Sequence, residues 1–212
     1  RFEAGNEKVK EFLRKKSGWQ SRRERMPLAF YDGTLLLSTP FPDSGMQTVF
    51  TNKLVELAQF STAAKVPLVG YVDRSYARDL LTLLDNFETG TTSNEKTLYD
   101  ATILHAATSD FRQVLKNWGE RTCFCYSKRR GLSAFINKAS GKSIVGFVYL
   151  QTTSDSAPAR IDIPSWIYEA GLLNEVLDVV RAECVIGLGY PYALETADAT
   201  AVITSRDREI FL

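Results

Sequence analysis

Asp32 is the first residue whose type and position suggest chemistry. It follows the apolar run Leu28–Tyr31 and precedes Gly33. A carboxylate directly after a buried strand emerges at the strand end and converges there with carboxylates of neighbouring strands, as two-metal nuclease sites require. An Asp-Gly pair followed by a second apolar run, here Leu35–Leu37, is also typical of a tight hairpin turn. Both interpretations stay open at this point.

Asp198 is the second candidate carboxylate. In a helix predicted to begin near Pro191, Asp198 shares a face with Leu194 and Ala201, because residues three and four apart lie on the same side. An acid on an inward face is costly unless it is paired or binds a metal. The alternative is that Asp198 borders the apolar stripe and meets solvent. Glu195, one turn earlier, could lie at the edge of the same site.

Tyr190 precedes Pro191 where this helix begins. From there its hydroxyl could reach a site near the helix N-terminus, where backbone N–H groups favour an anion such as phosphate. Packing that anchors the helix is the ordinary alternative. Asp73 ends another apolar run, Val66–Asp73, and repeats the argument for Asp32 in a weaker form.

Other kinds of catalytic site lack their parts. His105 is the only histidine and lies in an apolar stretch, which favours a structural role. Neither a P-loop nor a G-x-G-x-x-G pattern is present, and serine, cysteine and histidine are not arranged for nucleophilic catalysis. The cysteines, Cys123, Cys125 and Cys184, have no metal-ligand spacing, and the C-x-C pair is expected to lie in the core. Carboxylate–metal chemistry remains.

Composition indicates an ordinary globular protein. The 212 residues are 44% hydrophobic and 24% charged, with a net charge of +1, so no global charge favours nucleic acid. Basic residues concentrate between Lys8 and Arg25, which suits either phosphate contact or a solvated helix face. No apolar run approaches transmembrane length, and three cysteines without a disulfide pattern favour a reducing compartment. We therefore expect a cytoplasmic protein without a membrane segment.

Strands and helices are predicted to alternate. Strands are expected at 28–31, 66–73, 122–127 and 143–153, and at 158–164; helices are expected in the first segment, near 47–64 and 76–84, and after Pro164, Gly171 and Pro191. A last strand is predicted at 209–211. The strands at 143–153 and 158–164 are adjacent in sequence and read as a pair. The pattern predicts one α/β layered domain with a mixed sheet flanked by helices.

Three blocks of sequence resemble the NurA nuclease family. They are FYDGTLLLS, VPLVGYVDRSYARDLL, and the long closing block that ends in GYPYALETADATAVIT. The resemblance implies a ribonuclease H-like fold and a manganese-dependent nuclease that acts on DNA, as a 5′–3′ exonuclease and single-strand endonuclease. It also implies a homodimer that works with a HerA-type hexameric translocase in the end resection of double-strand breaks.

The resemblance also assigns roles by position. It makes Asp32 a metal ligand, Tyr190 the active-site tyrosine, and Asp198 the substitute for a histidine that many members carry. Glu3 or Glu7 would supply the glutamate of the preceding helix, and together these groups would hold two Mn²⁺ or Mg²⁺ ions. The basic residues that would hold the DNA backbone are Lys128, Arg129 and Arg130.

One further departure from the family pattern bears on activity. The family carries its first catalytic aspartate in an Asp-Gly-Ser motif on an N-terminal strand, which the sequence from Arg1 does not contain. Residues 1–212 are thus expected to form an N-terminally incomplete NurA-type nuclease domain, which would bind metal poorly and be nearly inactive if the upstream strand is absent. The alternatives are a catalytically degenerate NurA-like subunit that docks on a DNA translocase, and another ribonuclease H-like enzyme that acts on RNA.

Overall fold

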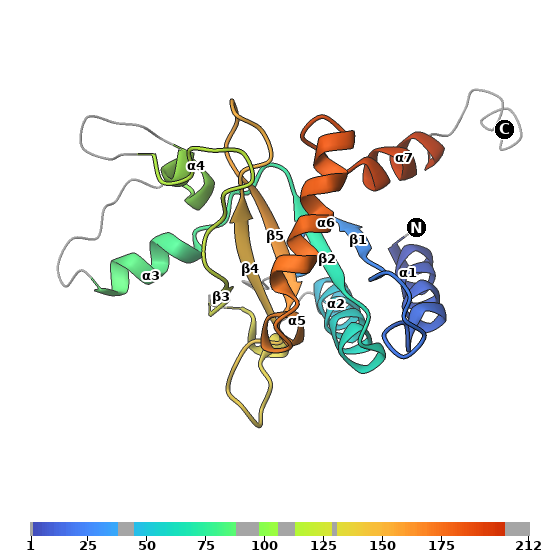
Figure 1. Cartoon of the computed structure of the whole chain (residues 1–212). Helices are drawn as coiled ribbons and strands as arrows, with labels where there is room; N and C mark the ends of the chain where they lie inside the picture. The colour runs from blue at the N-terminus through green and yellow to red at the C-terminus, as the bar shows by residue number, and fades with distance from the viewer. Residues whose placement is uncertain (1, 38–44, 88–97, 106–112, 129–130, 202–212) are drawn as a thin grey trace, which may run out of the picture.

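A computed structural model of the chain describes residues 2–37, 45–87, 98–105, 113–128 and 131–201 (Figure 1). In chain order the elements are α1 (Phe2–Lys16), β1 (Ala29–Asp32), α2 (Gly45–Ala64), β2 (Leu68–Val72), α3 (Asp79–Phe87), α4 (Asp100–His105), β3 (Cys125–Tyr126), η1 (Ser133–Phe135), β4 (Val145–Leu150), β5 (Ala159–Pro164), α5 (Ser165–Glu169), α6 (Leu173–Ile186) and α7 (Tyr192–Ala201). Among these, no helix is long and apolar enough to cross a membrane.

The strands form one mixed sheet in the order β1-β2-β5-β4-β3. β1 and β2 are parallel, and the other neighbouring pairs are antiparallel. Consequently the C-terminal ends of β1, β2 and β4 lie along one edge of the sheet, the edge that runs across the strand ends, and β5 begins at this edge. The predicted mixed α/β sheet flanked by helices is confirmed, and it is consistent with an α/β nuclease fold.

Helices cover both faces of the sheet (Figure 1). On one face, sheet residues such as Tyr71 and Ile161 pack against α5 and α6. On the other, Ala29, Leu68 and Val145 pack with α1 and α2. The sequence predicts an apolar stripe after Gly171 made of Leu172, Leu173, Val176, Leu177 and Val180. The last four lie on α6 and are buried, as is Cys184, whereas Leu172 precedes the helix and is half-buried. Both faces are apolar because alternate strand residues point to opposite sides.

The Asp32-Gly33 pair does not form a hairpin. No strand follows in residues 33–37, and the backbone N–H of Gly33 instead donates to the carbonyl of Tyr71 at 2.9 Å. The chain therefore crosses the end of β2 as it leaves β1, and Leu35 is buried against α1 and α2. Gly70 permits this close crossing, since a Cβ there would lie 2.7 Å from the carbonyl oxygen of Gly33. The strand-end interpretation of Asp32 is the one the structure supports.

Smaller differences concern the middle of the chain. The helix predicted from Tyr76 begins at Asp79, where the Asp100 carboxylate accepts hydrogen bonds from the N–H groups of Leu80 and Leu81. β3 is two residues long, and the prediction that both thiols of its C-x-C pair are buried is wrong for the exposed Cys123. The strand predicted at 209–211 lies outside the described residues.

Candidate active site

Two carboxylates leave the sheet at the edge where β1 and β2 end. Asp32 is the last residue of β1 and pairs with Tyr71 of the parallel neighbour β2. Asp73 directly follows β2, so it leaves the sheet at the same edge. Asp32 and Asp73 are both exposed. The two form an acidic edge over which α7 passes near the end of β1 (Figure 1).

Tyr190, from the C-terminal part of the chain, contacts Asp32 at this edge. Its hydroxyl donates a hydrogen bond to Oδ1 of Asp32, with the two oxygen atoms 3.1 Å apart. The Tyr190 ring meets the Tyr71 ring edge-on, with centroids 5.2 Å apart and planes at 87°. Tyr71 is buried in the core, so its ring contact holds the Tyr190 side chain in place beside Asp32. The structure thus brings together two of the residues that the sequence singled out.

The turn between α6 and α7 determines the position of Tyr190. The Gly189 carbonyl accepts a hydrogen bond from the Tyr71 hydroxyl at 3.1 Å, and its N–H donates to the Cys184 carbonyl at 2.7 Å. Gly189 has a φ of 112°, and a Cβ there would collide with the Thr153 side chain. Only glycine meets both conditions without strain. The turn is therefore fastened to β2 and to the loop that joins β4 and β5.

The negative charges of three carboxylates act on the hydroxyl of Tyr190. Burial of the hydroxyl raises the pKa of Tyr190, and the negative charges of Asp32, Asp198 and Asp73 raise it further. Because its pKa lies above the ordinary tyrosine value, Tyr190 keeps its proton at neutral pH and acts as a hydrogen-bond donor. This donor stands among acids supplied by β1, by α7 and by the residue after β2.

Asp198 lies on α7 with its side chain exposed, whereas Leu194 of the same helix is buried. The expectation of an inward-facing acid is therefore wrong, and the solvent-facing alternative applies. Asp198 nevertheless acts electrostatically on Tyr190. An exposed position beside the site leaves its carboxylate oxygens accessible to a cation.

The two glutamate candidates lie on α1. Glu3 lies in the first turn of α1, and the structure does not describe its side chain. The exposed Glu7 accepts from the Lys10 ammonium at 3.0 Å, and Lys10 also donates to Glu56 of α2 at 2.6 Å. Glu7 therefore belongs to a charge cluster between α1 and α2. The buried Lys10 is committed to these acids, which removes it from the basic residues available for phosphate contact.

The basic segment proposed to hold DNA follows β3. Tyr126 pairs with Gly146 near the start of β4, so the exposed Lys128 lies toward the sheet edge opposite to Asp32. Arg129 and Arg130 lie outside the described residues. The structure does not bring Lys128 to the carboxylates, and its contact with DNA stays a prediction.

The chemistry of the donors suits a hard divalent cation. Carboxylate oxygens are the ligands that Mg²⁺ and Mn²⁺ prefer, and no basic side chain of the described residues forms an ion pair with Asp32 or Asp198. Within the same part of the chain, no three acidic, histidine or cysteine side chains are grouped closely enough to hold a metal ion. The described residues thus offer suitable oxygen donors without forming a closed ligand set.

A buried polar network supports the turn that follows Asp32. Asp162 of β5 accepts from the Thr34 hydroxyl at 2.6 Å, from the Leu35 N–H at 3.0 Å and from Nε of Arg160 at 2.8 Å. Asp162 is fully buried, and a buried carboxylate is tolerable only when such partners replace water. The chain directly after the catalytic candidate is therefore fixed to the central strand of the sheet.

Arg160 is the cation of this network. It is 2% exposed, donates to Asp79 at 2.7 Å, and lies over the Phe147 ring at 4.0 Å. Burial alone would lower the pKa of Arg160, but the charges of Asp162 and Asp79 outweigh that effect and raise it. Sequence reasoning treated ARIDIP as a strand and missed this role. The available signal was the i, i+2 spacing of opposite charges, which places both side chains on one face.

These features define an α/β domain with a carboxylate–tyrosine site at the end of parallel strands. The NurA domain model matches residues 6–203, nearly the whole chain. The chain belongs to the NurA domain family, and it is therefore a member of a family of DNA-processing nucleases. No curated protein and no solved structure matches it.

Proposed function

We propose that this protein is a metal-dependent deoxyribonuclease whose site is built on Asp32, Tyr190 and Asp198. The observation that carries the proposal is the 3.1 Å hydrogen bond from Tyr190 to Asp32, made where β1 and β2 end in a NurA domain. The charges of Asp198 and Asp73 act on the same hydroxyl, which supports one shared site. The proposed activity is 5′–3′ exonuclease and single-strand endonuclease cleavage during end resection.

Asp32 and Asp198 would hold Mn²⁺ or Mg²⁺ together with Glu3 or Glu7 of α1. When bound, such ions lower the pKa of a bound water and stabilise the leaving oxygen in phosphodiester hydrolysis. Tyr190 keeps its proton, and its hydroxyl would exchange Asp32 for the scissile phosphate or the attacking water as its hydrogen-bond acceptor. Asp162 holds the turn after Asp32 in place through Thr34 and Leu35.

The direct test measures cleavage of linear duplex DNA, single-stranded DNA and RNA by the full chain, with Mn²⁺, with Mg²⁺ and with EDTA. We expect Mn²⁺-dependent cleavage of DNA that Asp32→Asn abolishes. Asp178→Asn is the matched control, because Asp178 is an exposed aspartate of α6 in a surface ion pair with Arg181. DNA cleavage that persists undiminished in Asp32→Asn contradicts the assignment.

The second candidate is a catalytically degenerate NurA-like subunit that docks on a DNA translocase. Two features favour it. In the described part of the chain, no three acidic, histidine or cysteine side chains lie close enough together to hold a metal ion. Position 198 is an aspartate, where the family resemblance implies a histidine in many members. Calorimetric titration with Mn²⁺ separates the two functions. Binding at millimolar or lower concentration that Asp32→Asn removes supports the nuclease, and absence of binding supports the docking subunit.

The partners and the compartment are part of the same proposal. DNA, a second copy of the chain and a HerA-type translocase are the proposed partners, and the cytoplasm is the proposed location. Exposed apolar residues gather at the corner between α6 and α7: Val185, Ile186, Leu188 and Tyr192. This corner is the surface that we propose for contact with a second copy. Sedimentation of the wild type against Leu188→Asp tests it, since a charge there should lower the average mass of a dimer.

A further inference from the structure

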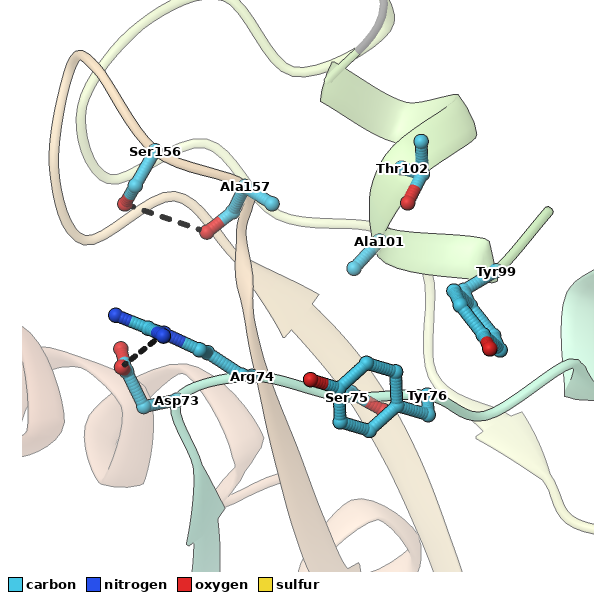
Figure 2. A pocket seen from close by; sticks show the side chains of 9 residues that line it. All are labelled: Asp73, Arg74, Ser75, Tyr76, Tyr99, Ala101, Thr102, Ser156 and Ala157. Carbon is cyan, nitrogen blue, oxygen red and sulfur yellow. Dashed lines mark hydrogen bonds and ion pairs between the residues drawn. The ribbon is translucent and has the colours of Figure 1, made fainter. Parts of the chain in front are cut away.

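A pocket of about 310 Å³ lies at the end of β2, next to the candidate active site (Figure 2). The segment after β2 forms its floor with Asp73, Arg74 and Tyr76, and the start of α4 and the loop between β4 and β5 form its walls. Its volume falls at the lower end of the range of about 300–1,000 Å³ that is common for small-molecule sites. A single flat ring with one charged group fits such a space.

The lining combines an aromatic surface with an exposed cation. Tyr76 is 71% exposed, and the Tyr99 ring supports it edge-on at 5.0 Å between centroids. The Arg74 side chain is 87% exposed, and its only ion pair in the described part of the chain is a long contact of 3.9 Å to Asp73. An exposed tyrosine held by a second ring keeps one face available for stacking, while the guanidinium can bind a phosphate.

The pocket and the candidate active site share structural elements. Asp73 lines the pocket and also acts on the hydroxyl of Tyr190. The loop that contributes Ser156 to the pocket wall also contributes Thr153, which contacts Gly189 in the turn that positions Tyr190. A DNA strand with its scissile phosphate at Asp32 would therefore have a neighbouring nucleotide within reach of Tyr76.

We propose that this pocket binds one nucleobase of single-stranded DNA, stacked on Tyr76, with an adjacent phosphate on Arg74. The proposal rests on the proposed nuclease function for the direction in which the strand runs toward Asp32. Stacking accepts every base, so the pocket selects an unpaired strand and not a sequence. A base within a duplex has no free face, and the pocket therefore favours frayed or single-stranded ends.

The first test measures binding in EDTA, so that cleavage does not interfere. The probe is a short fluorescein-labelled oligothymidylate, followed by fluorescence anisotropy. Loss of a stacked base predicts that Tyr76→Ala weakens binding about fivefold or more, whereas Tyr76→Phe keeps the wild-type affinity. Tyr168→Ala is the control, because Tyr168 is an exposed, ring-packed tyrosine at the opposite end of β5. Equal affinities of Tyr76→Ala and wild type overturn the proposal.

Two further measurements separate stacking from other causes. On an oligonucleotide of abasic residues, Tyr76→Ala and wild type should bind equally, and a loss as large as on oligothymidylate overturns the stacking contact. Arg74→Gln should lower the slope of log affinity against log salt by about 0.7, the value expected for one phosphate contact on a single strand. An unchanged slope removes Arg74 from the proposal.

Cleavage assays distinguish this proposal from the proposed function. If the wild type cleaves single-stranded DNA, Tyr76→Ala should raise KM and leave kcat unchanged, and unchanged values of both overturn the base pocket while the nuclease stands. If the wild type does not cleave, the nuclease assignment fails. The EDTA binding result then decides the pocket by itself, as a DNA-binding site of the subunit that docks on a translocase.

Discussion

The Thr34 hydroxyl donates a hydrogen bond of 2.6 Å to Asp162, across 128 positions of sequence. Thr34 lies two residues after Asp32, and Asp162 lies on β5, in the middle of the sheet. The same carboxylate accepts the N–H of Leu35. One buried acid thereby determines the path of the chain directly after the catalytic candidate, and it explains why a hydroxyl-bearing residue follows the Asp-Gly pair.

Removal of this hydroxyl should weaken both the fold and the site. Thr34→Val keeps the shape of the side chain but deprives the buried Asp162 of a donor, which should lower the free energy of unfolding by about 1–3 kcal/mol. Thr34→Ser keeps the donor and should stay close to wild type. Urea denaturation measures the stability, and Mn²⁺-dependent DNA cleavage should fall in the same order. Equal stability of the two variants contradicts the role given to the hydroxyl.

Tyr190→Phe should leave the fold intact and slow cleavage. The lost group is one hydrogen-bond donor at the proposed site, which is worth on the order of 100-fold in kcat at comparable sites. The variant keeps the ring contact with Tyr71, so its thermal unfolding should match the wild type. Wild-type kcat in this variant contradicts a role of the hydroxyl in the reaction.

The pH dependence of the reaction provides a second check on Tyr190. The pKa of Tyr190 is higher in the folded protein than its unfolded value of about 10. The stability that the protonated hydroxyl contributes is therefore complete below about pH 10, and it is lost only as pH rises through the folded pKa. Between about pH 7 and 9 the tyrosine should not titrate. A plot of log kcat for the wild type minus that for Tyr190→Phe should therefore be flat in this range.

Arg160→Met should be among the most destabilising substitutions in the described part of the chain. It removes the cation between Asp162 and Asp79 and leaves two buried acids without a positive partner. Loss of one partner of a buried ion pair costs about 3–5 kcal/mol, which guanidinium unfolding would measure. Arg22→Met, which breaks an exposed pair with Glu24 and an exposed hydrogen bond to the Ser17 carbonyl, should cost much less. A similar small effect in both variants contradicts the importance assigned to the network.

Two glycine substitutions should have opposite effects. Gly70→Ala places a Cβ 2.7 Å from the Gly33 carbonyl oxygen and should destabilise by about 1–3 kcal/mol through overpacking. Gly5→Ala, within α1 and with nothing within 4 Å, should stabilise by up to about 1 kcal/mol, because alanine favours the helix. Thermal unfolding of both variants checks the signs. Gly70→Ala should also reduce cleavage, since the affected carbonyl directly follows Asp32.

Thiol labelling should distinguish the cysteines in the native protein. Burial raises the pKa of Cys125 to about 12 and that of Cys184 to about 11, while Cys123 is exposed. At about pH 8 the two raised groups carry little reactive thiolate, so an aromatic disulfide reagent should label Cys123 quickly and the others slowly. In denaturant all three should react at once. Fast labelling of Cys123→Ser would show that another thiol is accessible.

Sequence patterns predicted the elements better than the site. The apolar stripe of α6 and the adjacent strands β4 and β5 depend on local periodicity, which the sequence displays directly. Asp32 at a strand end was one of two open interpretations, because local pattern cannot tell whether the next apolar run forms a strand or turns into the core. The structure decided this through Gly33 and Tyr71, whose contact joins distant parts of the chain.

The charged core residues were not predicted for a related reason. Arg160 and Asp162 are costly inside a protein and normally read as exposed. Their burial depends on partners contributed by Asp79 and Thr34, far away in sequence. For Asp198, an inward-facing position on α7 was one of two open interpretations. The side chain is exposed, since α7 lies over the edge of the sheet and presents this position to solvent.

The hydrogen bond between Tyr190 and Asp32 joins residues 158 positions apart. A domain folds during synthesis only as far as its residues have left the ribosome. A growing chain therefore presents Asp32 and a nearly complete sheet before it contains the tyrosine. On our assignment, a chain interrupted before this turn lacks Tyr190, and we expect it to cleave DNA poorly or not at all.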